Sequence, residues 1–149
     1  MNVIYAPNEV PENADTDSCL FLAGSIEMGT AEEWQTRILV YLADKNVLIL
    51  NPRRLDWDSS WEQKIENQKF REQVEWELNG LDMVDKILMY FDPKTKAPIS
   101  LLELGLYAHT KKLIVCCPDG FWKKGNVDIV CVKYNIPQIK HLSEIRDYF

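Results

Sequence analysis

The sequence predicts an α/β protein built on a mostly parallel five-stranded sheet, with helices on both of its faces. Short, continuously apolar runs alternate along the chain with longer amphipathic segments, which is the order that strands joined by crossover helices produce. The runs do not alternate apolar with polar residues, so the strands are expected to be buried on both sides. The length of 149 residues, with 46% hydrophobic side chains, predicts one domain with a sizeable core.

The apolar runs place the five strands, and the segments between them place the helices. Strands are expected in residues 19–23, 46–50, 86–91, 113–117 and 138–140. The first helix is expected to begin at a capping box, Thr30 followed three residues later by Glu33, and to end near Leu42. Further helices are expected in residues 62–81, around Glu103 as far as residue 112, and in residues 126–134 and 142–148. Residues 1–18 are polar and rich in Pro, Asn and Asp, so we expect an arm or short hairpin ahead of a domain that spans residues 19–149.

Composition and charge exclude several classes of protein. The net charge of −6 argues against a nucleic-acid polymer as partner. No apolar run approaches the roughly 20 residues that span a bilayer, and the N-terminus has no basic region followed by an apolar one, so neither a membrane protein nor a secreted one is expected. The four cysteines form no CxxC pair, which is typical of the reduced thiols of a cytoplasmic protein. With two histidines and no metal-ligand spacing, no metal site is expected.

Glu103 is the leading catalytic candidate. It lies in Pro98-Ile-Ser-Leu-Leu-Glu-Leu-Gly-Leu-Tyr-Ala108, just beyond an expected strand, and open α/β sheets bind ligands at the carboxyl edge. A carboxylate at that edge can attack the C1 carbon of a glycoside and form a covalent glycosyl-enzyme. It can also serve only the helix, because Ser100 and Glu103 have capping-box spacing and a first-turn Glu complements the helix dipole. The two interpretations are compatible, and the pattern alone does not choose between them.

Further candidates follow the first two strands, and each has a structural alternative. Gly24 and Ser25 place backbone N–H groups where a sugar hydroxyl or a phosphate could bind, or they form only a tight turn. Glu27, close by, would repel a phosphate. Trp57 and Trp61 could stack on a planar base, or they could fix their loop against the core.

Several segments occur together in one order along the chain. They are Phe21-Leu-Ala-Gly-Ser-Ile26 with Trp34-Gln35 downstream, Asn51-Pro-Arg53, Trp76-Glu77 before Val84-Asp85, Glu103-Leu-Gly-Leu-Tyr-Ala108, and Gly125-Asn-Val-Asp128. In this order they resemble the nucleoside 2-deoxyribosyltransferase superfamily, in its short bacterial-type branch. The resemblance covers roughly residues 19–140 and implies a flavodoxin-like sheet.

The resemblance implies a double displacement at C1 of 2-deoxyribose that uses no cofactor and no metal. Glu103 matches the nucleophile of the family. Glu77 matches the carboxylate that protonates the departing base, where the family more often has Asp. Arg53 and Asp85 lie in matching segments and are taken as substrate-binding candidates. From the pattern alone, Glu77 and Asp85 are equally typical of solvated surface charges.

One departure from the family and one inference about assembly follow from the same comparison. The family typically has Asp six residues before the nucleophile, where this chain has Ala97, although Ser100 keeps a small hydroxyl residue. The family completes its sites across subunits, so the resemblance implies a homo-oligomer in which Asn126 and Asp128 reach a neighbour's site. Asn126 is also typical of a helix N-cap.

Three functions follow as alternatives. The leading one is the transfer of 2-deoxyribose between nucleobases, with deoxynucleosides and free nucleobases as partners. The second is hydrolysis of the N-glycosidic bond of nucleoside 5′-monophosphates, the activity of a sister branch; Glu27 counts against it, although Arg53 could reach a phosphate. The third is a non-catalytic nucleoside-binding module, which only Ala97 favours. A new deoxynucleoside that forms only when a second base is present would identify the transferase.

Overall fold

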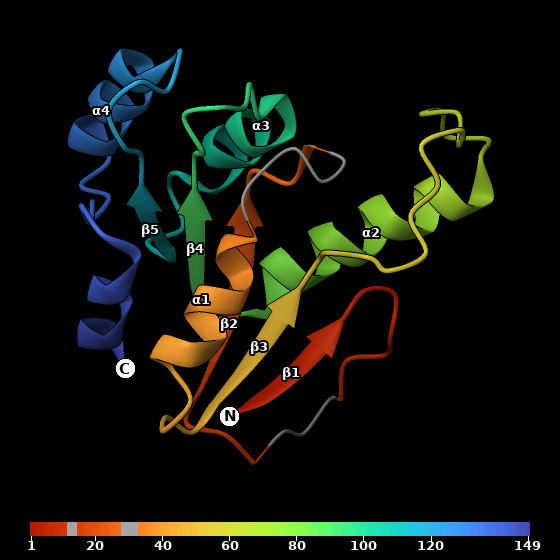
Figure 1. Ribbon diagram of the computed structural model, residues 1–149, viewed down its shortest axis with the longest axis horizontal. Coiled ribbons are helices and arrows are strands. Elements are labelled where there is room, and N and C mark those ends of the chain that lie inside the picture. The colour runs from red at the N-terminus through yellow and green to blue at the C-terminus, as the bar shows by residue number, and fades with distance from the viewer. Residues whose placement is uncertain (12–14, 28–32) are drawn as a thin grey trace.

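The computed structural model describes residues 1–11, 15–27 and 33–149, and it confirms the α/β class within them. Figure 1 shows one sheet with helices on both of its faces. The strands are β1 (Asn2–Tyr5), β2 (Ser18–Gly24), β3 (Val47–Asn51), β4 (Lys86–Tyr90) and β5 (Leu113–Cys116). The helices are α1 (Trp34–Tyr41), α2 (Gln68–Met83), α3 (Pro98–Tyr107), α4 (Lys124–Lys133) and the 3₁₀ helix η2 (Leu142–Tyr148). None of the helices in this described part is long and apolar enough to cross a bilayer.

The order of the strands defines the edge at which a ligand site is expected. Neighbouring strands run parallel in the order β1-β3-β2-β4-β5. The chain passes from β2 to β3 on one side, and then crosses over to β4 on the other side of β2 (Figure 1). Open parallel sheets bind ligands at such a switch point, beyond the carboxyl ends of the strands. The segments that follow β2, β3 and β4 are therefore the ones that position a site.

Two apolar layers cover the two faces of the sheet. Along β2, Phe21 and Ala23 belong to the layer under α2, α3 and α4, whereas Leu20 and Leu22 belong to the layer under α1 and η2. Side chains alternate between faces along a strand, so a strand with both faces buried is apolar at every position. This explains why the apolar runs predicted β2 and the three strands after it.

The edges of the sheet differ from the prediction. Residues 2–5, expected within an arm or hairpin, form β1 and pair in parallel with residues 48–51 of β3. Residues 138–140, expected as the fifth strand, contribute only an isolated bridge between Val115 and Gln138. Both segments are short and partly exposed, and the brief apolar run at residues 3–6 stands among polar residues that favoured an arm. Residues 2–5 form a strand because they pair with the free edge of β3.

Three helix starts also differ from the prediction. Helix α2 begins at Gln68 rather than near residue 62, because residues 62–67 form turns and the Asn67 side chain accepts the Phe70 backbone N–H at 3.1 Å. Helix α3 begins at Pro98, which is favourable at a first helical position, so the capping box expected at residues 100–103 is wrong. Helix α4 begins at residue 124, so residue 126 lies within it and is not an N-cap. The capping box expected at residue 30 lies outside the described residues.

Candidate active site

Two carboxyl groups, those of Glu77 and Glu103, come together on the face covered by α2 and α3. Helix α2 carries Glu77, and Glu103, only 7% exposed, lies on α3. Burial raises the pKa of Glu77 from 4.5 to about 7. Burial, and after it the charge of Glu77, raises the pKa of Glu103 from 4.5 to about 8. Both shifts favour the protonated form, so these two carboxyls hold their protons to a higher pH than exposed ones do.

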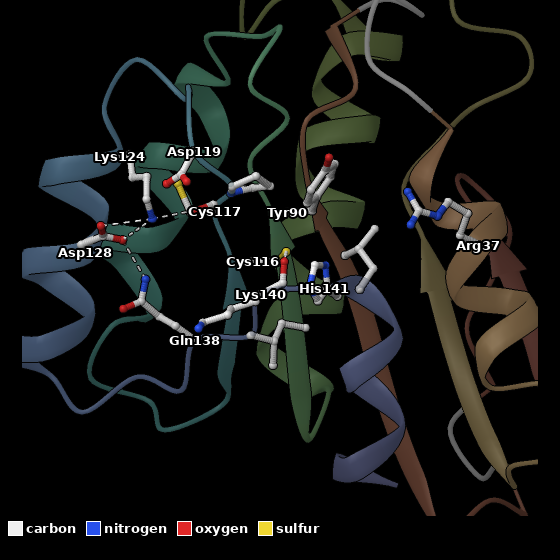
Figure 2. A pocket seen from close by; sticks show the side chains of 13 residues that line it. Arg37, Tyr90, Cys116, Cys117, Asp119, Lys124, Asp128, Gln138, Lys140 and His141 are labelled. Atoms are coloured by element: carbon white, nitrogen blue, oxygen red, sulfur yellow. Dashed lines mark hydrogen bonds and ion pairs between the residues drawn. The ribbon is translucent and has the colours of Figure 1, made fainter.

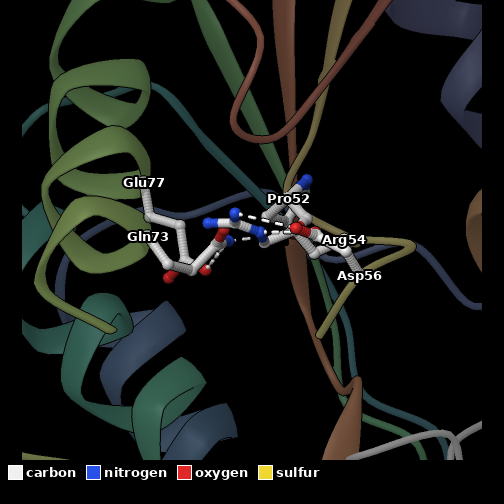
Figure 3. A network of polar contacts seen from close by, with 5 residues as sticks. All are labelled: Pro52, Arg54, Asp56, Gln73 and Glu77. Atoms are coloured by element: carbon white, nitrogen blue, oxygen red, sulfur yellow. Dashed lines mark hydrogen bonds and ion pairs between the residues drawn. The ribbon is translucent and has the colours of Figure 1, made fainter. Parts of the chain in front are cut away.

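Gln73 fixes the position of Glu77. Its Nε2 atom donates to a Glu77 carboxylate oxygen at 2.7 Å and to the Pro52 carbonyl oxygen at 3.0 Å (Figure 3). Because Pro52 directly follows β3, these bonds connect α2 to the carboxyl end of that strand. Glu77 is thereby held at the edge of the sheet where ligands are expected.

The two arginines after β3 lie beside this connection. Arg53 lies 3.5 Å from the carboxylate of Glu33, the N-cap residue of α1, and its side chain is 20% exposed. Arg54 pairs with Asp56 through two contacts of 2.8 and 3.2 Å, and its side chain is only 5% exposed. Each arginine is thus paired with a carboxylate outside the carboxyl pair, and neither lowers the pKa of Glu77 or Glu103.

The turn after β2 is tightly built. Gly24 has φ +129°, and a Cβ atom there would lie 2.3 Å from the Tyr90 carbonyl oxygen, so a residue without a side chain is required. The buried Ser25 hydroxyl accepts the Asp92 backbone N–H at 3.0 Å and the Thr95 hydroxyl at 2.7 Å. Ser25, a substrate-binding candidate, thus joins the ends of β2 and β4 within the fold.

Glu27 supplies the missing cap of α3. Its Oε1 atom accepts the backbone N–H groups of Lys96 and Ala97, both at 2.6 Å. These N–H groups lie at the positive end of the helix that carries Glu103, where an anion binds favourably. The carboxylate of the protein itself therefore occupies the position that a bound phosphate would take.

The structure places the other predicted site residues differently, Asp85 away from Glu103 and Ser100 on the same buried face of α3 as Glu103. Asp85 precedes β4, at the opposite edge of the sheet, and its Oδ2 accepts the Cys19 backbone N–H at 2.8 Å, so its placement does not fit a shared site with Glu103. Trp57 packs edge-on against Trp61 with ring centroids 5.0 Å apart. Ser100 is buried within the first turn of α3.

The two α4 candidates lie away from the carboxyl pair of their own chain. Asn126 is exposed on α4. Asp128 accepts hydrogen bonds from Lys124 Nζ at 3.2 Å and from Gln138 Nε2 at 2.8 Å. Asp128 also lines a cavity of about 830 Å³ beyond the carboxyl ends of β4 and β5, which neither Glu77 nor Glu103 lines (Figure 2).

The remaining reactive groups do not form a second centre. Within residues 1–11, 15–27 and 33–149, no three His, Cys, Asp or Glu side chains are arranged to hold a metal ion. All four cysteines are free. Burial raises the pKa of Cys116 and Cys131 to about 11 and that of Cys117 to about 12, which keeps these thiols protonated and poorly nucleophilic.

Sequence reasoning missed the bond from Gln73 to Glu77, the capping role of Glu27 and the burial of Gln35. Gln73 precedes Glu77 by four residues, a spacing at which side chains on a helix interact, so that signal was present. The cap by Glu27 joins residues about 70 apart and leaves no local signal. Gln35 stands among the apolar positions of α1, and nothing in the periodicity distinguishes it.

Comparison with known proteins places this geometry in context. A family model described as nucleoside 2-deoxyribosyltransferase like matches residues 17–121, which hold both carboxyl groups, the arginines and the turn after β2. A comparison with curated proteins found no match.

Proposed function

Because the chain belongs to the nucleoside 2-deoxyribosyltransferase-like family, we propose that it transfers 2-deoxyribose between nucleobases through a covalent deoxyribosyl–Glu103 intermediate. Its substrates are deoxynucleosides and free nucleobases. The single observation that carries the proposal is the buried pair of Glu77 and Glu103 with raised pKa values.

The reaction needs a proton on Glu77 and an ionised Glu103, so a proton that Glu103 holds in the empty site has to leave it before the attack. An ionised Glu103 attacks C1, and a C1–O bond forms as the C1–N bond to the base breaks. The electron pair of the broken bond goes to the base nitrogen, which takes the proton of Glu77. A second base then attacks C1, displaces Glu103 and returns its proton to Glu77. Two displacements leave the configuration at C1 unchanged, and every atom and electron is balanced without a cofactor.

We further propose a homo-oligomer, and a cytoplasmic setting that the four free cysteines support. Large apolar side chains on the outer surfaces of α3 and α4 are more than half exposed: Ile99, Leu102 and Leu106 on α3, and Ile129 and Val132 on α4. Such neighbouring apolar residues are typical of an interface with another protein copy. A second copy there would bring its own Asn126 and Asp128 close to this surface.

The alternative hydrolase of nucleoside 5′-monophosphates has less support. The Ser25 hydroxyl is bonded within the fold, and Glu27 occupies the N–H groups at the start of α3. The binding-module alternative leaves unexplained why two carboxyls are buried side by side, since an unpaired buried carboxyl destabilises a fold.

The test is a chromatographic assay in which the protein is incubated with a deoxynucleoside, with and without a second free base. A new deoxynucleoside that forms only with the second base is expected, and Glu103→Gln should abolish it because glutamine cannot attack C1. Mass spectrometry with a 2-fluoro-2-deoxynucleoside should place a sugar adduct on Glu103. Free sugar and base as the only products, or turnover of 5′-monophosphates alone, would identify the hydrolase; binding that Glu103→Ala leaves intact, with no turnover, would identify the binding module.

A further inference from the structure

The buried polar atoms without a partner are not scattered through the protein. Six buried side-chain nitrogen and oxygen atoms of the described residues lack a hydrogen-bond partner, and all six belong to Gln35, Arg53, Arg54 and Gln73. Native proteins pair almost all such groups, and an unpaired buried one destabilises the fold. A cluster of them therefore calls for a bound molecule that completes it.

Gln73, Arg53 and the start of α1 are linked near the carboxyl end of β3, whereas Arg54 pairs with Asp56. Gln73 donates to the carbonyl oxygen of Pro52, which immediately precedes the two arginines (Figure 3). Arg53 contacts Glu33, the N-cap residue of α1, and Gln35 is the second residue of that helix. Gln73 therefore bonds Glu77 directly, and Arg53 and Gln35 follow from it through Pro52 and the first residues of α1.

The burial of these side chains is unusually complete for polar groups. Gln35 is 1% exposed and neither atom of its amide has a partner. Gln73 is 4% exposed, and its Oε1 atom is unpaired although its Nε2 atom makes two bonds. Arg53 leaves Nε and Nη2 unpaired, and Arg54 leaves Nη1 unpaired.

The free atoms define what the ligand must offer. Four of them are nitrogen donors, from Gln35, Arg53 and Arg54, and two are amide oxygen acceptors, from Gln35 and Gln73. An inorganic anion would satisfy the donors but leave the amide oxygens unpaired, and it would lie beside the carboxyl of Glu77. A heterocycle with carbonyl oxygens and a ring N–H between or beside them satisfies both kinds of atom.

We propose that Gln35, Arg53 and Gln73 form the base subsite, and that it selects nucleobases with a lactam or imide edge, such as thymine, over bases without a carbonyl group, such as adenine. The proposal rests on the proposed function, since it names the base class that the site with Glu77 and Glu103 takes. The base would then lie next to Glu77, the group that protonates it.

Binding without turnover tests the subsite separately from the reaction. Isothermal titration calorimetry on the Glu103→Gln protein measures the affinity for thymidine, N3-methylthymidine and deoxyadenosine. Thymidine should bind at least tenfold more tightly than the other two, because methylation removes the ring N–H and adenine lacks the carbonyls. Equal affinities, or no binding of thymidine, would overturn the base class.

Variants in the same Glu103→Gln background test the residues. Gln35→Met and Arg53→Met should each weaken thymidine binding about tenfold, the loss expected for one or two hydrogen bonds. Gln35→Met should also melt at or above the temperature of its parent, because it removes an amide that has no partner. Gln68→Met, on the exposed first residue of α2, is the matched control and should change neither property.

Unchanged thymidine affinity in both Gln35→Met and Arg53→Met would overturn the subsite and leave water as the partner of these atoms. If the native protein fails to transfer deoxyribose while the variants still lose thymidine binding, the proposed reaction fails and the subsite stands.

Discussion

Replacing Glu103 by Gln should stabilise the folded protein at alkaline pH and leave its stability at acid pH almost unchanged. The pKa of Glu103 rises from 4.5 to about 8 in the folded protein, chiefly because the carboxyl is buried. The folded state therefore keeps a proton that the unfolded chain releases near pH 4.5. The stability contributed by that proton is fully present below pH 4.5 and is lost as the pH rises through about 8. At about 1.4 kcal/mol per pKa unit, the loss amounts to at most about 5 kcal/mol.

Thermal unfolding between pH 4.5 and 9 measures this loss. For a chain of this length, 1 kcal/mol shifts the melting temperature by about 2–4 °C. Glu103→Gln should therefore melt at nearly the native temperature at pH 4.5, and up to about 10–20 °C above it at pH 9. Glu66→Gln, at an exposed position in the loop before α2, is the control and should follow the native curve. Parallel curves for the native protein and Glu103→Gln would refute a buried, protonated carboxyl at this position.

Two further predictions concern the turn after β2. Gly24→Ala should lower the free energy of unfolding by about 2–4 kcal/mol in urea titrations, because the new Cβ would collide with the Tyr90 carbonyl at a positive φ. Gly105→Ala, where nothing lies within 4 Å of an added Cβ, should raise it by up to about 1 kcal/mol. Inorganic phosphate should raise the melting temperature of the Glu27→Ala protein but not that of the native protein, because the substitution frees the two N–H groups that Glu27 accepts. Glu144→Ala removes a similar carboxylate cap from η2 and is the control, so phosphate should not change its melting temperature. An equal effect of phosphate on the native protein and on Glu27→Ala would contradict the role of Glu27.

The buried strands were predictable because burial on both faces requires a run of apolar residues that is visible in the local sequence. Strands β2 to β5 pack on both faces, so they are apolar except at their ends and can be identified without any knowledge of their neighbours. Strand β1 pairs with β3 on one side only. Two of its four residues are partly buried, and the other two are exposed. Its existence depends on the free edge of β3, some 45 residues away in the chain.

The candidate site residues were proposed from the resemblance, and their roles stay predictions. Glu77 and Glu103 were identified together in this way, and the structure brings them close enough for one charge to raise the pKa of the other. Asp85, in the same matched segment as Glu77, lies instead at the amino edge, because the chain enters β4 there. The contribution of Gln35 depends on the absence of a partner, which is a property of the folded protein that no sequence pattern records.

The charge of the substrate follows from what already occupies the start of α3. Lys96 and Ala97 donate their N–H groups to Glu27, six or seven residues before Glu103. Both N–H groups lie just before Pro98, the first residue of the helix that carries Glu103. A 5′-phosphate there would have to displace a carboxylate that makes two short bonds and would meet its negative charge. The occupied helix start therefore supports the proposal of deoxynucleosides, rather than their monophosphates, as substrates.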